Sequence, residues 1–458
     1  MGESKKSKPA LPSIDEVFPL RGVPEYTYQR REDLERRILE YSTSGTGVAL
    51  VHGPTKSGKS VLVQKTLLGQ PGEALYVYAP DAETRDEFWT VANALLGTFT
   101  GRAKGKGSLV GHDLETRGEV TGIWAKLGFG HKRRAEETHR DDVSATDPAN
   151  IVVTRELLRT GRTLIIDDLH MLERKEQRRI MLSLKPFVDQ GGRLIVIAAG
   201  HRAELIPPLV PNMAGSFVDF AFSLWGDNNA LANIALEGWE KLNYHPDADF
   251  AQKLALNSFG SPQIMQRLSA HLIRHNGHTK AAETPNTVLQ WPTDEDDFFR
   301  GLLSEKNLEV SWLKKLTRGP AGRARAKYIT HADGPADGYR LIILALRSLL
   351  PRMDHFQSDL QRKVVELTVA DAPIEGKVEV KVPVLSTPRP GETTSKLDKM
   401  AEMARRPLSD HASEDELDKV ADEVSVDPVL EYRGKGANAR IQLVDPLFAY
   451  ALRWWSHN

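Results

Sequence analysis

The sequence predicts an α/β fold, with a three-layer parallel sheet, a helical lid and a mostly α C-terminal domain. Three observations predict it. Short β-branched apolar runs alternate with amphipathic helical segments, a glycine- and lysine-rich loop joins the first run to a helix, and helices precede a hairpin pattern near the C-terminus. At 458 residues the chain is too long for one compact core, so we expect two or three domains.

The elements of the first half follow a repeating order. Strands that alternate with helices favour a parallel sheet covered on both faces. Helices are expected within residues 24–45, 60–69, 82–97 and 173–192, and strands within residues 47–53, 74–80, 163–172, 193–200 and 216–224.

The remaining chain divides by composition. We expect a flexible tail at 1–20, a core at 21–226 with a glycine-rich basic insertion at 97–147, a helical lid at 227–280, a linker at 281–297 and a C-terminal domain at 298–458. The insertion could be a hairpin or a mobile loop. In the last domain we expect helices at 338–350 and 355–368, an irregular stretch at 370–395, helices around Leu397 and Leu417, two strands within 428–444, and a closing helix at 445–456. This order resembles a winged helix.

Composition restricts the possible functions. A net charge of −1 gives no global attraction to nucleic acid or membrane, so such binding would need local basic patches. The absence of cysteine excludes disulfides, thiolate zinc sites and cysteine nucleophiles. No apolar run approaches the roughly 18 residues that span a bilayer, and the polar N-terminus is not a secretory signal. We therefore expect a cytoplasmic protein without a membrane partner.

The loop after the first predicted strand matches the phosphate-loop pattern. Its glycines allow backbone torsions that direct successive N–H groups inward, and the following helix adds its positive dipole end. Lys59 would reach the β- and γ-phosphates, and the Ser60 hydroxyl could bind Mg²⁺. A chance polar turn is the alternative, but the strand–loop–helix context favours the phosphate site. The expected nucleotide-binding residues are Gly53, Pro54, Thr55, Lys56, Ser57, Gly58, Lys59, Ser60 and Val61.

A second motif, a pair of aspartates, lies at the end of the apolar run in the strand predicted within 163–172. Asp167 would bind Mg²⁺, and Asp168 could polarise the attacking water as a general base. Alternatively, Asp168 only caps the helix that follows. The catalytic candidates are Lys59, Asp168 and Arg202, and the metal candidates are Ser60 and Asp167.

With both motifs present, the chain resembles P-loop ATPases of the AAA+ and STAND (signal-transduction ATPases with numerous domains) types. The segment at 25–35, with its Arg31-Glu32 pair, is similar to the segment that flanks adenine in these families. Gly260-Ser261-Pro262 resembles the turn of their helical lid. The stretch 444–447 before an aromatic helix resembles their C-terminal winged-helix end.

The chain departs from these families where they place polar sensors. Ala198 and Ala199 stand where Thr or Asn is usual, which leaves His201 and Arg202 as candidates. Gln263 follows the lid proline where many members have an arginine. Arg202 could contact phosphate, act in a neighbouring subunit, or lie idle at the surface. These departures favour slow turnover.

The resemblance implies a molecular switch that depends on ATP and Mg²⁺ and hydrolyses ATP slowly. The switch would control oligomerisation or a separate effector protein, with possible roles in prokaryotic defence or regulation. A DNA-binding AAA+ ATPase is one alternative, and a nucleotide-binding scaffold that hardly hydrolyses is another. DNA could bind a basic C-terminal wing, although a solvated surface explains the same charges. Basic residues gather in three places: Lys104, Lys106, Lys126, Lys132, Arg133 and Arg134; Arg318, Arg323, Arg325 and Lys327; and Arg433, Lys435 and Arg440.

Overall fold

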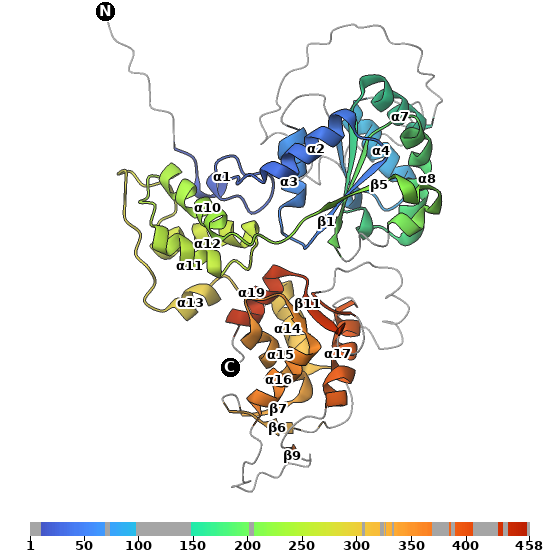
Figure 1. The fold of residues 1–458 in the computed structure, drawn as a ribbon. Coiled ribbons are helices and arrows are strands. Elements are labelled where there is room, and N and C mark those ends of the chain that lie inside the picture. The colour runs from blue at the N-terminus through green and yellow to red at the C-terminus, as the bar shows by residue number, and fades with distance from the viewer. Residues whose placement is uncertain are drawn as a thin grey trace, which may run out of the picture. The chain divides into compact units, whose positions relative to one another are not determined.

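The chain forms two compact units, which we describe separately (Figure 1). The first contains residues 19–53 and 58–223, and the second contains residues 1–18, 54–57 and 224–458. The structure is a computed structural model. It describes residues 11–68, 74–97, 148–200, 206–304, 307–320, 325, 327–331, 334–368, 384–385, 390–405, 429–433 and 438–455.

The first unit is built on a five-stranded parallel sheet. Its strand order is β2-β3-β4-β1-β5, so every connection is a crossover. The central strands read as continuous apolar runs because both of their faces are covered. The strands are β1 (Val48–Gly53), β2 (Ala74–Tyr78), β3 (Thr163–Asp167), β4 (Leu194–Ala199) and β5 (Phe217–Ala221).

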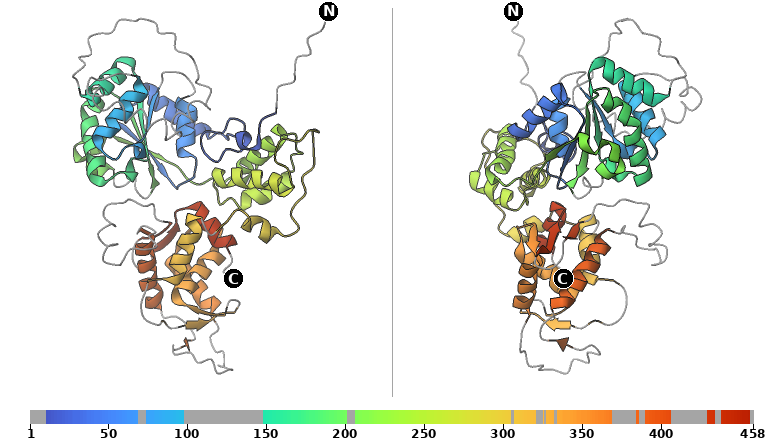
Figure 2. Two further views of the ribbon diagram at one scale, coloured as in Figure 1. Left: turned by 180° about the vertical axis from the view of Figure 1, so that it is seen from behind. Right: turned by 45° about the vertical axis from the view of Figure 1, so that its right-hand side comes forward.

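Helices cover both faces of this sheet, as the two views in Figure 2 show. One face is covered by α2 (Glu32–Ser44) and α3 (Lys59–Leu67). The other is covered by α4 (Arg85–Leu96), α7 (Ala149–Thr160) and α8 (Arg174–Asp189). This is the three-layer fold of P-loop NTPases, as the sequence predicts.

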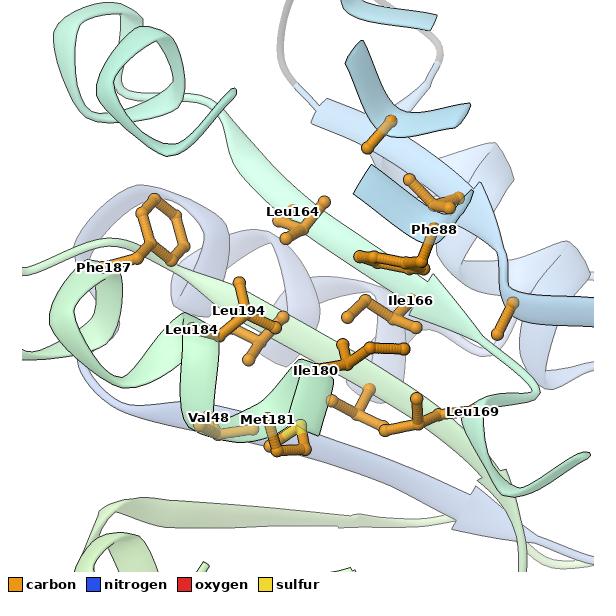
Figure 3. Packing of buried hydrophobic residues seen from close by; sticks show 14 of the residues in the cluster. Val48, Phe88, Leu164, Ile166, Leu169, Ile180, Met181, Leu184, Phe187 and Leu194 are labelled. Atoms are coloured by element: carbon orange, nitrogen blue, oxygen red, sulfur yellow. The ribbon is translucent and has the colours of Figure 1, made fainter. Parts of the chain in front are cut away.

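Alternate residues of each strand enter opposite cores. On β3, Leu164 and Ile166 pack with Phe88 of α4 and Ile180 of α8 (Figure 3). Ile165 lies in the core on the α2–α3 face. This period-two division follows from strand geometry, and it orients the side chains at the strand ends as well.

The second unit is mostly helical. Helices α10 (Asn228–Lys241), α11 (Ala248–Leu256) and α12 (Pro262–His275) pack together and are followed by α13 (Glu295–Arg300). The C-terminal elements are α14 (Leu308–Arg318), β6 (Lys327–Ile329), β7 (Pro335–Asp337), α15 (Gly338–Leu349), β8 (Asp354–Phe356), α16 (Gln357–Leu367), β9 (Val384–Leu385), α17 (Pro390–Arg405), β10 (Leu430–Arg433), β11 (Arg440–Leu443) and α19 (Pro446–Trp454). The unit also holds the short helix α1 (Ile14–Val17). The described 3₁₀ helices Ala79–Asp81, Leu169–Met171, Pro207–Leu209 and Pro211–Ser216 belong to the first unit.

Two small sheets accompany these helices. One has the antiparallel order β10-β11-β8, and the other has the order β7-β6-β9. The expected pair of strands within 428–444 is therefore confirmed as β10 and β11, and β8 joins them as a third strand.

The structure corrects the sequence analysis at several places. His355 and Phe356 belong to β8 and not to the helix expected at 355–368. Helix α7 was not predicted, although Val152, Val153 and Leu157 form its buried face. Helix α17 already begins at Pro390, inside the stretch expected to be irregular, because Pro is tolerated at the first position of a helix. Residues 98–147 of the insertion expected at 97–147, the expected helix around Leu417 and residues 1–10 of the expected tail lie outside the described residues. The described half of the tail is not simply flexible, because it contains α1 and buries Ile14, Val17 and Phe18. Among the helices that the structure describes, none is both long and apolar enough to cross a membrane.

Candidate nucleotide-binding site

The loop between β1 and α3 begins at a position that requires glycine. Gly53 has φ 151°, and a Cβ placed there would lie 2.3 Å from the carbonyl oxygen of Phe222. The Phe222 backbone is held in place because its N–H donates to the His52 carbonyl at 2.6 Å. The first glycine of the motif thus allows the chain to leave the sheet against a neighbouring backbone.

The second glycine, Gly58, occupies the N-cap of α3 with φ 93°. No side chain caps this helix end. The first N–H groups of a helix need acceptors from outside the helix, and the helix dipole favours an anion there. The start of α3 therefore has the backbone arrangement of a phosphate-binding loop.

Lys59, the first residue of α3, is 8% exposed, and its Nζ donates to the Gly53 carbonyl at 3.0 Å. This hydrogen bond joins the last part of the loop to its first residue. A buried ammonium with a neutral acceptor is well placed to transfer its hydrogen bond to a phosphate oxygen. Ser60 follows on the same helix turn.

Asp167 ends β3 and is 2% exposed. Its carboxylate accepts hydrogen bonds from Ser60 and from the Tyr76 hydroxyl, the latter on Oδ2. Among the described residues, its buried Oδ1 has no hydrogen-bond partner. The structure thus brings the predicted Ser60 and Asp167 together and leaves one carboxylate oxygen for a ligand.

Burial raises the pKa of Asp167 above its usual value, while hydrogen bonds from Ser60 and Tyr76 and the charge of Lys59 act in the opposite direction. Burial also raises the pKa of Tyr76, and the Asp167 carboxylate adds to this shift. The phenol therefore keeps its proton at neutral pH and acts as the donor.

Asp168 has a different setting. It takes a left-handed backbone conformation with φ 55°, its N–H donates to the Ile197 carbonyl at 3.1 Å, and its side chain is 36% exposed. Its carboxylate does not cap the short 3₁₀ helix that follows, Leu169–Met171. Oδ1 lies 3.9 Å from Nδ1 of His170. The exposed carboxylate of Asp168 is thus accessible to water, unlike the buried carboxylate of Asp167.

The donors present fit Mg²⁺. This ion is usually held by one or two protein oxygens together with substrate phosphates and water, and Ser60 and Asp167 supply a hydroxyl and a carboxylate. Among the described residues, no group of three or more His, Asp or Glu side chains could hold a metal by itself.

Lys56 is placed differently from Lys59. Pro54–Ser57 are grouped with the second unit, and there Lys56 Nζ lies 2.5 Å from Oδ2 of Asp445 and 3.8 Å from Glu309. The Ser261 hydroxyl donates to the Lys56 carbonyl at 3.1 Å. The ammonium of Lys56 is therefore paired with carboxylates, so only the backbone of this residue remains for the expected phosphate contact.

The expected lid turn and sensor positions differ in how far the structure describes them. In the lid, Ser261 caps α12 by accepting from the Ile264 N–H, and Pro262 takes the first helical position. Ala198 and Ala199 are buried at the end of β4. His201 and Arg202 lie outside the described residues, so the role of Arg202 stays a prediction.

The segment expected to flank adenine is anchored to its own unit. Arg31 donates to the Ser223 carbonyl at 3.0 Å and lies over the Phe222 ring, and burial lowers its pKa to about 10. The Tyr28 hydroxyl donates to Glu35 of α2 at 2.8 Å.

Sequence reasoning missed Tyr76. The run from Ala74 to Tyr78 was interpreted only as a strand. Two tyrosines at alternate positions of a strand put two hydroxyl groups on one face, and that face could have been matched with the acids ending a neighbouring strand.

Comparisons with known proteins do not assign this chain to a family. No protein-family model matches the sequence, and no curated protein matches it. The Walker-type ATPase paby2304 of Pyrococcus abyssi is 14% identical over 95% of this chain and 99% of its own, with a TM-score of 0.47. Cdc6p from Pyrobaculum aerophilum is 13% identical over 97% and 99%, with a TM-score of 0.38. The ORC2 protein of Aeropyrum pernix, solved as ADPNP–ADP complexes, is 14% identical over 96% and 96%, with a TM-score of 0.43. These TM-scores are below 0.5, so the fold assignment rests on the strand order and the loop geometry of this chain.

Proposed function

We propose that the protein binds ATP with Mg²⁺ and hydrolyses it slowly, as a molecular switch of the AAA+ type. One observation carries the proposal: the buried Lys59 and the Ser60–Asp167 pair meet at the uncapped start of α3. A cation, a hydroxyl–carboxylate pair and a helix N-terminus without a side-chain cap together match the charges of a triphosphate and its metal.

Each of these residues would have its own role in nucleotide binding and hydrolysis. The loop backbone and Lys59 bind the phosphates, and Ser60 and Asp167 hold the metal. When bound, Mg²⁺ would neutralise charge on the phosphates. Asp168 accepts a proton from the attacking water, and its exposed side chain suits that role.

Slow turnover is supported by the sequence at the sensor positions. The end of β4 carries Ala198 and Ala199, and Gln263 replaces an arginine in the lid. Fewer groups are then available to stabilise charge in the transition state. We propose that nucleotide state, rather than rapid hydrolysis, is the output, read as self-association or as control of a separate partner.

The test combines calorimetry with size-exclusion chromatography and light scattering. Ligand-stripped protein should bind ATP, and its mass should change between the nucleotide-free and the ATP–Mg²⁺ states. No heat on titration with adenine or guanine triphosphates would reject nucleotide binding. Bound ATP with an unchanged mass would reject switching by self-association.

A second candidate is nucleic-acid binding by the second unit. The observation that favours it is a hollow of about 310 Å³ between α14 and α15, lined by Lys314, Thr317, Arg318 and Arg340. Three cations and a hydroxyl are donors suited to a phosphate backbone. Strands β8, β10 and β11 with α15, α16 and α17 also follow the order of a winged helix.

The arginines of the β10–β11 hairpin support nucleic-acid binding less. Arg433 pairs with Glu431 at 2.6 Å, and Arg440 pairs with Asp354 at 2.5 Å. Phosphate binding would have to displace these carboxylates. Lys435 lies outside the described residues.

Fluorescence anisotropy with a labelled DNA duplex separates the two basic regions. Under this candidate, Arg318→Glu with Arg340→Glu abolishes salt-dependent binding, whereas Arg433→Glu with Arg440→Glu weakens it less. Equal affinity for wild type and the Arg318/Arg340 variant would exclude the hollow as the binding site.

A further inference from the structure

Tyr76 hydrogen-bonds the buried carboxylate that the proposed function assigns to the metal. Its hydroxyl donates to Oδ2 of Asp167. Gln64 of α3 hydrogen-bonds the same hydroxyl. The Tyr76 hydroxyl is therefore held by α3, the helix that follows the phosphate loop, and by β3, the strand next to its own.

The sheet register explains this contact. Tyr76 lies beside Ile165, and Tyr78 lies beside Asp167. Ile165 belongs to the core under α3, and Tyr76 packs against that core. Because residues i and i+2 of a strand share a face, Asp167 lies on the same face as Tyr76, two positions further along. The length of a tyrosine side chain spans that offset.

The two oxygens of Asp167 are thereby made different. Oδ2 accepts the Tyr76 hydrogen bond, while Oδ1 is buried and has no hydrogen-bond partner among the described residues. A buried carboxylate oxygen without a partner is costly, so such an atom is explained when a ligand completes it.

We propose that Tyr76 is a positioning residue that holds Asp167 through Oδ2 and so presents Oδ1 to the metal and its water shell. The inference rests on the proposed nucleotide site. Partners that hydrogen-bond a metal ligand typically change metal affinity roughly 10–100-fold when they are removed. A tyrosine that only fills the core would change stability without changing metal affinity.

The test compares two tyrosine-to-phenylalanine variants in the full-length protein. Tyr76→Phe removes the hydroxyl on Asp167. Tyr41→Phe is the matched control, because Tyr41 is buried in the same core and its hydroxyl donates to the carbonyls of Gly47 and Leu194. Mn²⁺ is titrated in the presence of ADPNP, a slowly hydrolysed ATP analogue, and free Mn²⁺ is followed by electron paramagnetic resonance.

We expect Tyr76→Phe to weaken Mn²⁺ binding by roughly 10-fold or more, with metal-free ADPNP affinity unchanged, while Tyr41→Phe binds Mn²⁺ as wild type does. Equal Mn²⁺ affinity in all three proteins would overturn the inference while leaving the nucleotide site intact. Wild type that binds no ADPNP would instead reject the proposed function.

A second variant covers the case in which Tyr76→Phe fails to fold. Gln64 lies at a partly exposed position of α3 and is the other hydrogen-bond partner of the Tyr76 hydroxyl. The substitution Gln64→Leu removes this hydrogen bond. It should weaken Mn²⁺ binding in the same direction by a smaller factor. Unchanged Mn²⁺ affinity in a folded Gln64→Leu protein, together with an unfolded Tyr76→Phe protein, would assign Tyr76 a purely structural role.

Discussion

The carboxyl edge of the five-stranded sheet and the surface of the mostly helical unit both carry many charges, but they hold them in opposite ways. At the sheet edge, Lys59 and Asp167 are buried, and Oδ1 of Asp167 has no hydrogen-bond partner among the described residues. In the helical unit, Arg433 and Arg440 are half exposed and directly paired with carboxylates. A buried carboxylate oxygen without a hydrogen-bond partner indicates a ligand site, whereas a half-exposed arginine that is already paired with a carboxylate is less available to a ligand. Large mutational effects on ligand binding and chemistry are therefore expected at the sheet edge.

The largest effect is expected from Asp168→Asn. A positioned general base contributes roughly 10²–10⁴-fold in rate, so ATP hydrolysis should fall by that factor while ATP affinity is retained. Phosphate release and calorimetry measure the two quantities. Asp86→Asn, at an exposed position of α4, is the control. If hydrolysis were equal in wild type and Asp168→Asn, the protein would be a nucleotide-binding scaffold.

Lys59→Ala should have the next largest effect. Hydrogen bonds to charged groups contribute about 1.5–3 kcal/mol, so ATP should bind roughly 10–100-fold more weakly. Lys65→Ala on the same helix removes an exposed ammonium and should bind ATP as wild type does. An equal loss of ATP affinity in Lys59→Ala and Lys65→Ala would contradict the distinction between the buried and the exposed ammonium.

Gly53→Ala tests the backbone of the same edge. The added Cβ would lie 2.3 Å from the Phe222 carbonyl oxygen, so the strand end must shift. Gly191→Ala is a matched control, since Gly191 also has positive φ, at 83°, but a Cβ there would meet nothing within 4 Å. The free energy of unfolding by urea should fall by roughly 1–3 kcal/mol more for Gly53→Ala than for the control. Equal losses would show that backbone conformation alone decides the cost.

The smallest effect is a pH dependence in the helical unit. Burial lowers the pKa of His271 below its usual value, and its Nε2 lies 3.1 Å from the Phe298 carbonyl oxygen. The unfolded chain therefore takes up the proton first, so this contribution to stability is present above about pH 6.5 and is lost as the pH falls below it. The cations Arg267, Arg274 and His275 near this ring act in the same direction.

Urea unfolding between pH 7.5 and 5.5 measures this effect. His271→Gln, which cannot titrate, should unfold with a weaker pH dependence than wild type. An unchanged dependence in His271→Gln would assign the pH response to other groups.

Particular elements show why the sequence was informative at the sheet edge. The loop Gly53–Ser60 is contiguous, so its spacing alone carries the phosphate-binding pattern. The strands around it are continuous apolar runs, because a parallel sheet buries both faces. Helix α7 was missed because its sequence follows directly after the expected glycine-rich insertion at 97–147 and was not separated from it.

By itself, the sequence determined the α/β class, the phosphate-loop pattern at Gly53–Ser60 and the acidic end of β3, because each depends on neighbouring residues and on local backbone preferences. Only the tertiary structure decided which oxygen of Asp167 is occupied, that Tyr76 occupies it, and that Arg433 and Arg440 are paired with acids. These contacts depend on which strands lie side by side and in what register. The packing of the whole sheet sets the pairing of distant strands, and spacing along the chain does not reveal it.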